Sequence, residues 1–212
     1  MKKFLLDLLL AVAAGIMISV GGIVFLACES KALGAFLFAV GLMAICEFGL
    51  NLYTGKIGYT VCANQPPILN RIGFVATVWL GNLLGAFLGG TVYSLAKTTV
   101  CDKASELCYK KLTTGYLSPF ILGIFCGILM FVAVDIFKRN AGSFSKFLGI
   151  FIGVPVFILA GFEHSIADMA YFALAGKLFS FDSLLFILLV TLGNTLGGMM
   201  IPCVLRIKDK VQ

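Results

Sequence analysis

The pattern of apolar and polar positions divides the chain into six long apolar stretches separated by shorter polar segments. Each stretch is long enough to cross a bilayer as a helix, which takes about 20 residues for about 30 Å of hydrocarbon. The six stretches cover residues 4–27, 33–53, 72–96, 116–137, 147–175 and 181–205. The pattern therefore predicts an all-α membrane protein with six transmembrane helices in a single transmembrane domain over residues 1–212.

Composition and charge agree with a location in lipid. Hydrophobic residues make up 60% of the 212 residues, charged residues only 12%, and the mean hydropathy is +1.06. The first apolar stretch is longer than the about 7 to 15 apolar residues of a secretory signal, which favours a first membrane helix. The side that holds both termini carries the larger share of lysine and arginine, so both ends are expected in the cytoplasm of a cell inner membrane. The net charge of +6 needs no nucleic-acid partner to explain it.

An internal repeat relates the two halves of the chain at one constant offset. This offset places Gly81-Asn82-Leu83-Leu84-Gly85 on Gly193-Asn194-Thr195-Leu196-Gly197, and residues 51–56 on residues 163–168. Three helices in a repeat is an odd number, so the two halves must cross the membrane in opposite directions. The sequence therefore predicts two inverted three-helix repeats, over about residues 1–100 and 113–212.

Inverted repeats of this kind place their functional site near the membrane midplane on interrupted helices, so we expect broken second and fifth helices. In the first half, Thr54-Gly55-Lys56-Ile57-Gly58 predicts the break, whereas in the second half a break at residues 163–168 rests on symmetry. Asn82 and Asn194 are expected to cap or bridge the broken segments.

The only histidine of the chain, His164, lies in an apolar stretch between Glu163 and Asp168. A charged group near the bilayer centre costs at least about 2.5 to 3.5 kcal/mol, so such residues usually face a protein interior or a pore. One histidine beside two carboxylates is a poor set of metal ligands, so neither a metal nor another cofactor is predicted and an intramembrane enzyme is the weaker interpretation.

Three motifs in the same order along the chain resemble the formate/nitrite transporter family. Residues 161–169 match its fifth-helix signature, residues 51–55 its second-helix loop, and Gly193-Asn194 its sixth helix. The resemblance implies an aquaporin-like channel rather than an enzyme, assembled as a homopentamer with one pore in each subunit. It also implies protons and a small monovalent anion as partners, with formate first and nitrite or hydrosulfide next.

The resemblance also implies roles for individual residues. His164 matches the central pore histidine, Thr54 its hydroxyl neighbour and Lys111 the vestibule lysine, with Asn51 and Glu163 beside the pore. The apolar constrictions of the family fall on Phe38, Leu42, Leu52, Tyr53 and Phe157.

The chain departs from the family at four positions. Asn51 stands where the family usually has Glu, Gly127 where it usually has Asn near the histidine, and Lys56 and Asp168 where it commonly has two Asn. Opposite charges would relieve one another's desolvation, so we expect an ion pair between Lys56 and Asp168.

Apolar constrictions around a lone histidine suit a weak acid that loses its charge in transit. With an unperturbed pKa of about 6.5, His164 can donate or relay the proton, or hold the anion while a proton arrives from water. The alternative is a passive channel for a small neutral solute such as ammonia, urea or water, although the paired Asn-Pro-Ala motifs of aquaporins are absent from the sequence.

Seven cysteines are scattered along the chain without metal-ligand spacing. Cys101 and Cys108 lie in one predicted outer loop, and the sequence is compatible both with a disulfide between them and with two free thiols.

Overall fold

The computed structural model describes residues 1–62, 66–139 and 144–211, and all regular structure within these ranges is helical. Four of the described helices are long and apolar enough to cross a bilayer: α1 (Lys2–Ala27), α4 (Ile68–Ser94), α6 (Leu117–Arg139) and α9 (Phe181–Val211). They fall on the first, third, fourth and sixth predicted stretches. The all-helical membrane fold predicted from the sequence is thus confirmed at this level.

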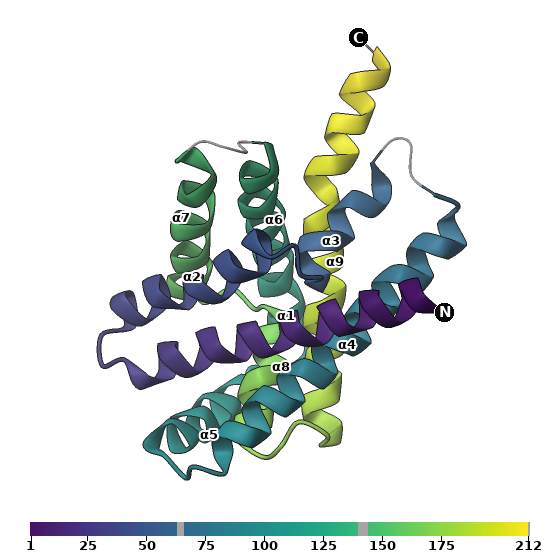
Figure 1. Ribbon diagram of the computed structural model, residues 1–212. Coiled ribbons are helices and arrows are strands. Elements are labelled where there is room, and N and C mark those ends of the chain that lie inside the picture. The colour runs from purple at the N-terminus through teal and green to yellow at the C-terminus, as the bar shows by residue number, and fades with distance from the viewer. Residues whose placement is uncertain (63–65, 140–143, 212) are drawn as a thin grey trace.

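Two helix pairs cross closely: α1 packs on α4, and α6 packs on α9 (Figure 1). A Cβ atom added to Gly85 would lie 2.0 Å from the carbonyl oxygen of Val12, and one added to Gly197 would lie 1.9 Å from that of Ile124. The internal repeat relates the two contacts, since it aligns Gly85 with Gly197 and Val12 with Ile124. The glycines at four-residue spacing therefore allow the backbones to approach within van der Waals contact.

The second and fifth apolar stretches are each divided into shorter helices. The second consists of α2 (Lys31–Glu47), α3 (Tyr53–Lys56) and the 3-10 helix η1 (Ile57–Val61). The fifth consists of α7 (Ser145–Leu159) and α8 (Ser165–Leu174).

The first interruption lies before the predicted position. Thr54 and Lys56 are inside α3, and the chain leaves its helix at Phe48 instead. Gly49 has φ +65° and Gly161 has φ +75°, a left-handed conformation that glycine adopts without a steric penalty and that commonly follows the end of a helix. Residues 51 and 52 lie in the interruption, but the predicted chain break at residues 54–58 was wrong, because the glycine with the left-handed conformation comes before the polar segment rather than within it.

Helix α8 lies near the middle of the molecule (Figure 1). All ten of its residues are buried, and it contacts α1, α4, α5 and α9. Because this helix is covered on every side, no face of it contacts solvent. Its single charged residue, Asp168, therefore needs an interaction partner inside the protein.

The segment predicted as a basic outer loop contains a helix, α5 (Thr99–Leu112). Cys101 and Cys108 both lie on it and both are free thiols. Seven residues along an α-helix span about 10.5 Å, beyond the about 7 Å that a disulfide can bridge between Cα atoms. Burial also raises the pKa of the Cys108 thiol to about 12, so this cysteine is a packing residue.

The close crossings give a direct test of the fold. Gly85→Ala and Gly197→Ala are each expected to destabilise the protein by about 1 to 3 kcal/mol, because the added methyl group meets a backbone carbonyl that cannot move without parting the helices. The measurement is thermal unfolding of the purified protein in detergent.

Gly73→Ala is the matched control, because a Cβ atom at Gly73 in the same helix as Gly85 meets nothing within 4 Å. Alanine favours a helix over glycine by about 1 kcal/mol, so this variant should be as stable as the parent or slightly more stable. Equal effects at Gly73 and Gly85 would contradict the crossing geometry.

Candidate functional site

Asn82 ties the start of α3 to two long helices. Its Oδ1 accepts the backbone N–H of Tyr53 at 2.8 Å, and its Nδ2 donates to the carbonyl oxygens of Ala11 and Asn51, each at 2.8 Å. The side chain is fully buried. One amide thus pairs two backbone groups at the interruption, the Tyr53 N–H and the Asn51 carbonyl, and connects them to the Ala11 carbonyl of α1.

Asn194 does the same for α8. Its Oδ1 accepts the N–H of Ser165 at 2.9 Å, and its Nδ2 donates to the carbonyl oxygens of Gly123 and Glu163, each at 2.9 Å. The internal repeat aligns every partner of Asn194 with the corresponding partner of Asn82. The two asparagines therefore fix the first residues of both short helices.

His164 is the N-cap residue of α8 and faces Thr54 of α3. Its Nδ1 accepts the backbone N–H of Ala167 at 3.1 Å, and its Nε2 lies 2.9 Å from the Thr54 Oγ1. Because Nδ1 accepts a hydrogen bond, the single proton of the neutral ring belongs on Nε2, which donates to Thr54. A second ring proton would point at the Ala167 N–H and at the positive end of the helix dipole, so this geometry holds the imidazole neutral.

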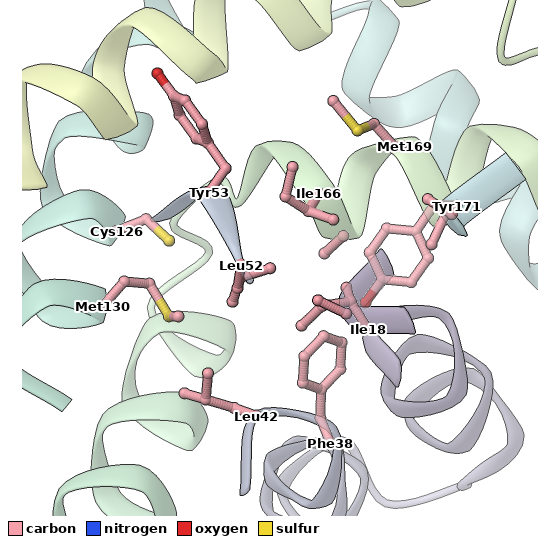
Figure 2. Packing of buried hydrophobic residues seen from close by; sticks show 14 of the residues in the cluster. Ile18, Phe38, Leu42, Leu52, Tyr53, Cys126, Met130, Ile166, Met169 and Tyr171 are labelled. Atoms are coloured by element: carbon pink, nitrogen blue, oxygen red, sulfur yellow. The ribbon is translucent and has the colours of Figure 1, made fainter. Parts of the chain in front are cut away.

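Apolar side chains enclose this contact. The Phe157 ring stacks on the His164 ring with centroids 5.8 Å apart, and the Phe38 ring meets Phe157 edge-on at 6.1 Å. Leu42 and Leu52 belong to the same buried cluster and are each 1% exposed. Figure 2 shows Phe38, Leu42 and Leu52 within this cluster.

Two cavities, each of about 310 Å³, reach the enclosed region. The His164-side cavity is lined by His164, Phe157, Lys111, Glu163 and Asp168, among others. The Leu52-side cavity is lined by Leu42, Leu52, Gly55, Lys56, Val134 and Lys138, among others. Leu52 and His164 are the N-cap residues of the two short helices, so each cavity ends where a helix begins.

Lys111, near the end of α5, reaches two carboxylates. Its ammonium pairs with Glu163 and lies 2.9 Å from the Asp168 Oδ1, and the Tyr171 and Phe186 rings lie 5.9 Å and 5.7 Å from it. Burial alone would lower the pKa of Lys111, but the charges of Asp168 and Glu163 raise it above its ordinary value. Lys111 is therefore a paired cation rather than a free one.

The predicted ion pair between Lys56 and Asp168 is wrong. Asp168 pairs with Lys111, whereas Lys56 lines the other cavity. The two aligned positions lie on different short helices, Lys56 on α3 and Asp168 on α8, and they line different cavities, so they are kept apart rather than brought together.

Four residues predicted at the pore line neither cavity: Thr54 and Phe38, which lie at the enclosed contact, and Asn51 and Tyr53, which have partners elsewhere. The Asn51 side chain donates to the carbonyl oxygen of Asp7 at 3.2 Å. The Tyr53 hydroxyl is 2.8 Å from the Thr195 Oγ1, and the ring points away from Leu52 (Figure 2). Both side chains thus hold α3 against its neighbours.

Gly127 lies at the crossing of α6 and α9. A Cβ atom there would be 2.4 Å from the Asn194 carbonyl oxygen, which leaves no room for the asparagine that the family usually has. Within the described ranges, no group of three His, Cys, Asp or Glu side chains is arranged to hold a metal ion.

A sequence model of the formate/nitrite transporter family matches residues 2–207. The chain belongs to this family. It is similar to the nitrite transporter NirC of Escherichia coli (strain K12), with 29% identity over 174 residues that cover 76% of this chain and 65% of that protein. It is also similar to the formate channel BtFdhC of Bacillus thuringiensis, with 26% identity over 176 residues covering 78% of this chain and 68% of that protein. The chain thus spans just under two thirds of the length of NirC.

Solved structures share the fold. A pentameric formate channel with formate bound superposes with a TM-score of 0.87 at 23% identity, over 100% of this chain and 99% of that one. An FNT family ion channel superposes with a TM-score of 0.82 at 24% identity, over 98% of this chain and 88% of that one. The arrangement of helices is therefore that of the family's channels.

The Lys111 cluster gives a test of the site. Lys111→Met is expected to destabilise the protein by about 3 to 5 kcal/mol, because it leaves two buried carboxylates without their cation. Because the folded-state pKa of Lys111 is raised, its stabilisation is complete below the ordinary lysine value of about 10.4 and is lost only as the pH rises beyond it. The loss in thermal stability should therefore be equal at neutral and mildly alkaline pH.

Lys110→Met is the control, because Lys110 is exposed and forms no ion pair within the described residues. It should change the free energy of unfolding by less than about 0.5 kcal/mol. If the Lys111→Met protein were as stable as the Lys110→Met protein, the ion-pair cluster of Lys111 would make no contribution to the free energy of unfolding.

Proposed function

We propose that this protein is a channel that passes small monovalent weak-acid anions together with protons, past His164. The observation that carries the proposal is the contact between His164 and Thr54, which joins the starts of two interrupted helices between two cavities. Membership of a transporter family supports the same conclusion.

The proposed channel is a single domain of six spans, built as two inverted repeats over about residues 1–100 and 113–212. The matching hydrogen bonds of Asn82 and Asn194 support this arrangement, since they recur at the offset found in the sequence. In this description α2 with α3, and α7 with α8, each cross the membrane as one interrupted span.

The apolar residues around His164 define what can pass. Phe38, Leu42, Leu52 and Phe157 offer no partner to a bare anion, and moving an unpaired charge into such surroundings is far more costly than moving a neutral acid. His164 is held neutral, with its proton on Nε2 and directed at Thr54. An anion that displaces the Thr54 hydroxyl would accept this hydrogen bond, and a proton that joins the anion there would cancel its charge.

Formate is the first substrate, with nitrite and hydrosulfide next. Relatives named as a nitrite transporter and as a formate channel support the first two. We place the protein in the cell inner membrane as a homopentamer, with both termini in the cytoplasm and lipid around the assembly. The pentameric structural relative and the exposed leucines on the spans, such as Leu80, Leu84 and Leu192, support this assembly and location.

A flux experiment in proteoliposomes tests the proposal. Uptake of formate, nitrite, hydrosulfide, acetate, lactate and chloride is compared at about pH 5.5 and about pH 7.5, on either side of the ordinary histidine pKa. Formate or nitrite should enter faster than lactate and chloride, and faster at the lower pH. His164→Asn should weaken the pH dependence, because asparagine can still cap α8 but has no group that takes up or releases a proton in this pH range.

Protein-free liposomes and the Lys208→Met protein are the controls, because Lys208 is exposed and lines neither cavity. Rapid urea or ammonia entry without anion uptake would favour the passive channel for a neutral solute. A His164→Asn protein with the pH profile of the parent would contradict the role given to His164.

A further inference from the structure

The two cavities carry different charges. The His164-side cavity is lined by three lysines, Lys31, Lys110 and Lys111, and by the two carboxylates Glu163 and Asp168. The Leu52-side cavity is lined by three lysines, Lys56, Lys138 and Lys146, and by no acidic residue. The Leu52-side cavity is therefore the more attractive of the two for an anion.

Lys56 lines the Leu52-side cavity. It follows Gly55 at the end of α3, is half-buried, and shares the cavity wall with Leu42 and Leu52. Across the three described stretches of the chain, no carboxylate lies within 4.0 Å of its ammonium and no hydrogen bond satisfies it. A cation partly removed from water without a partner is expected to attract a counter-ion.

Lys138 stands at the exposed rim of the same cavity. Its ammonium lies 3.6 Å from the centre of the Tyr59 ring, a contact that positions the charge without neutralising it. Lys146 differs, because Glu47 lies 3.1 Å from its ammonium.

The nearby carboxylates are directed elsewhere. Asp135 is bound by Arg139 and by the Tyr59 hydroxyl. Asp7 lines an adjoining hollow that Lys56 and Lys138 also reach, and it is not within ion-pair distance of either lysine. Lys56 and Lys138 are thus two unpaired cations on one cavity, next to two buried leucines.

We propose that Lys56 and Lys138 bind a small monovalent anion in the Leu52-side cavity, immediately before the apolar constriction. The inference rests on the proposed function and deepens it, since it assigns the capture of the permeating anion to these lysines rather than to Lys111. Lys111 already has two carboxylate partners, so it has little net charge to offer. Lys56 has no partner to lose when an anion arrives.

One consequence is a difference between the two sides of the membrane. An anion that enters through the Leu52-side cavity meets two unpaired cations before the constriction, whereas one that enters through the His164-side cavity meets a compensated cluster. The half-saturating formate concentration should therefore be lower for entry through the Leu52-side cavity.

The test compares formate uptake into membrane vesicles of both orientations, and it measures formate binding to the purified protein by line broadening of 13C-formate. In Lys56→Gln the half-saturating concentration for entry through the Leu52-side cavity should rise roughly three- to tenfold, with the effect shrinking as inert salt is added. The line broadening should weaken in parallel. Lys56→Arg, which keeps the charge, should stay near the parent, and Lys138→Gln should show a smaller rise than Lys56→Gln.

Lys146→Gln is the matched control, because Lys146 lines the same cavity but is already paired with Glu47. The subsite would be overturned if the half-saturating concentration rose equally in Lys146→Gln and Lys56→Gln. It would also be overturned if that concentration did not change in Lys56→Gln while formate was still transported. Neither result would contradict the proposed channel. Formate binding that depends on Lys56 in a protein that transports no anion would instead support the subsite and contradict the proposed channel. If the Lys56→Gln protein does not fold, Lys138→Gln is compared with Lys146→Gln instead. Equal half-saturating concentrations in these two variants would also overturn the subsite.

Discussion

The structure depends on how two asparagine side chains satisfy the backbone where two helices are interrupted. Inside a membrane protein, N–H and C=O groups without a partner cost several kcal/mol each, so a helix can stop in the interior only where other groups complete its hydrogen bonds. Asn82 and Asn194 each pair one N–H and one carbonyl at an interruption, and each donates a further hydrogen bond to a carbonyl of a neighbouring long helix. The starts of α3 and α8 are fixed as a result, and with them Thr54 and His164.

A second constraint is charge in the buried region. Asp168 lies on a helix with no exposed residue, so its carboxylate is tolerable only because α5 brings Lys111 to it. Lys56 is placed under the opposite condition, on a cavity wall and without an ion-pair partner among the described residues. The fold thus holds a compensated cluster beside one cavity, and Lys56 and Lys138, which form no such ion pair, beside the other, so the two cavities differ in their chemistry.

Much of the fold was predictable because the sequence repeats itself. Four of the apolar stretches predicted the four long helices, and the constant offset between the halves paired Asn82 with Asn194. The same offset also pairs Gly49 with Gly161, a signal that would have located both interruptions correctly. The helix α5 was missed because its mixed polar and apolar pattern resembles a loop between spans when only long apolar stretches are sought.

Less of the site was predictable, because contacts between helices depend on the orientations of helices and side chains in space, which the sequence pattern does not specify. Aligned positions suggested a pair between Lys56 and Asp168, but the two residues line different cavities and Lys111 is the ion-pair partner of Asp168. Tyr53 was assigned to the constriction with Leu52, but adjacent residues at a helix start point in different directions. His164 and Thr54 were predicted as neighbours, and their side chains lie 2.9 Å apart.

The central claim is that an anion crosses the apolar constriction only with its charge cancelled. It is tested most directly by recording formate uptake, proton uptake and electrical current together in the same proteoliposomes. The account predicts that one proton accompanies each formate and that no net current flows. A current proportional to formate uptake, without proton movement, would contradict it.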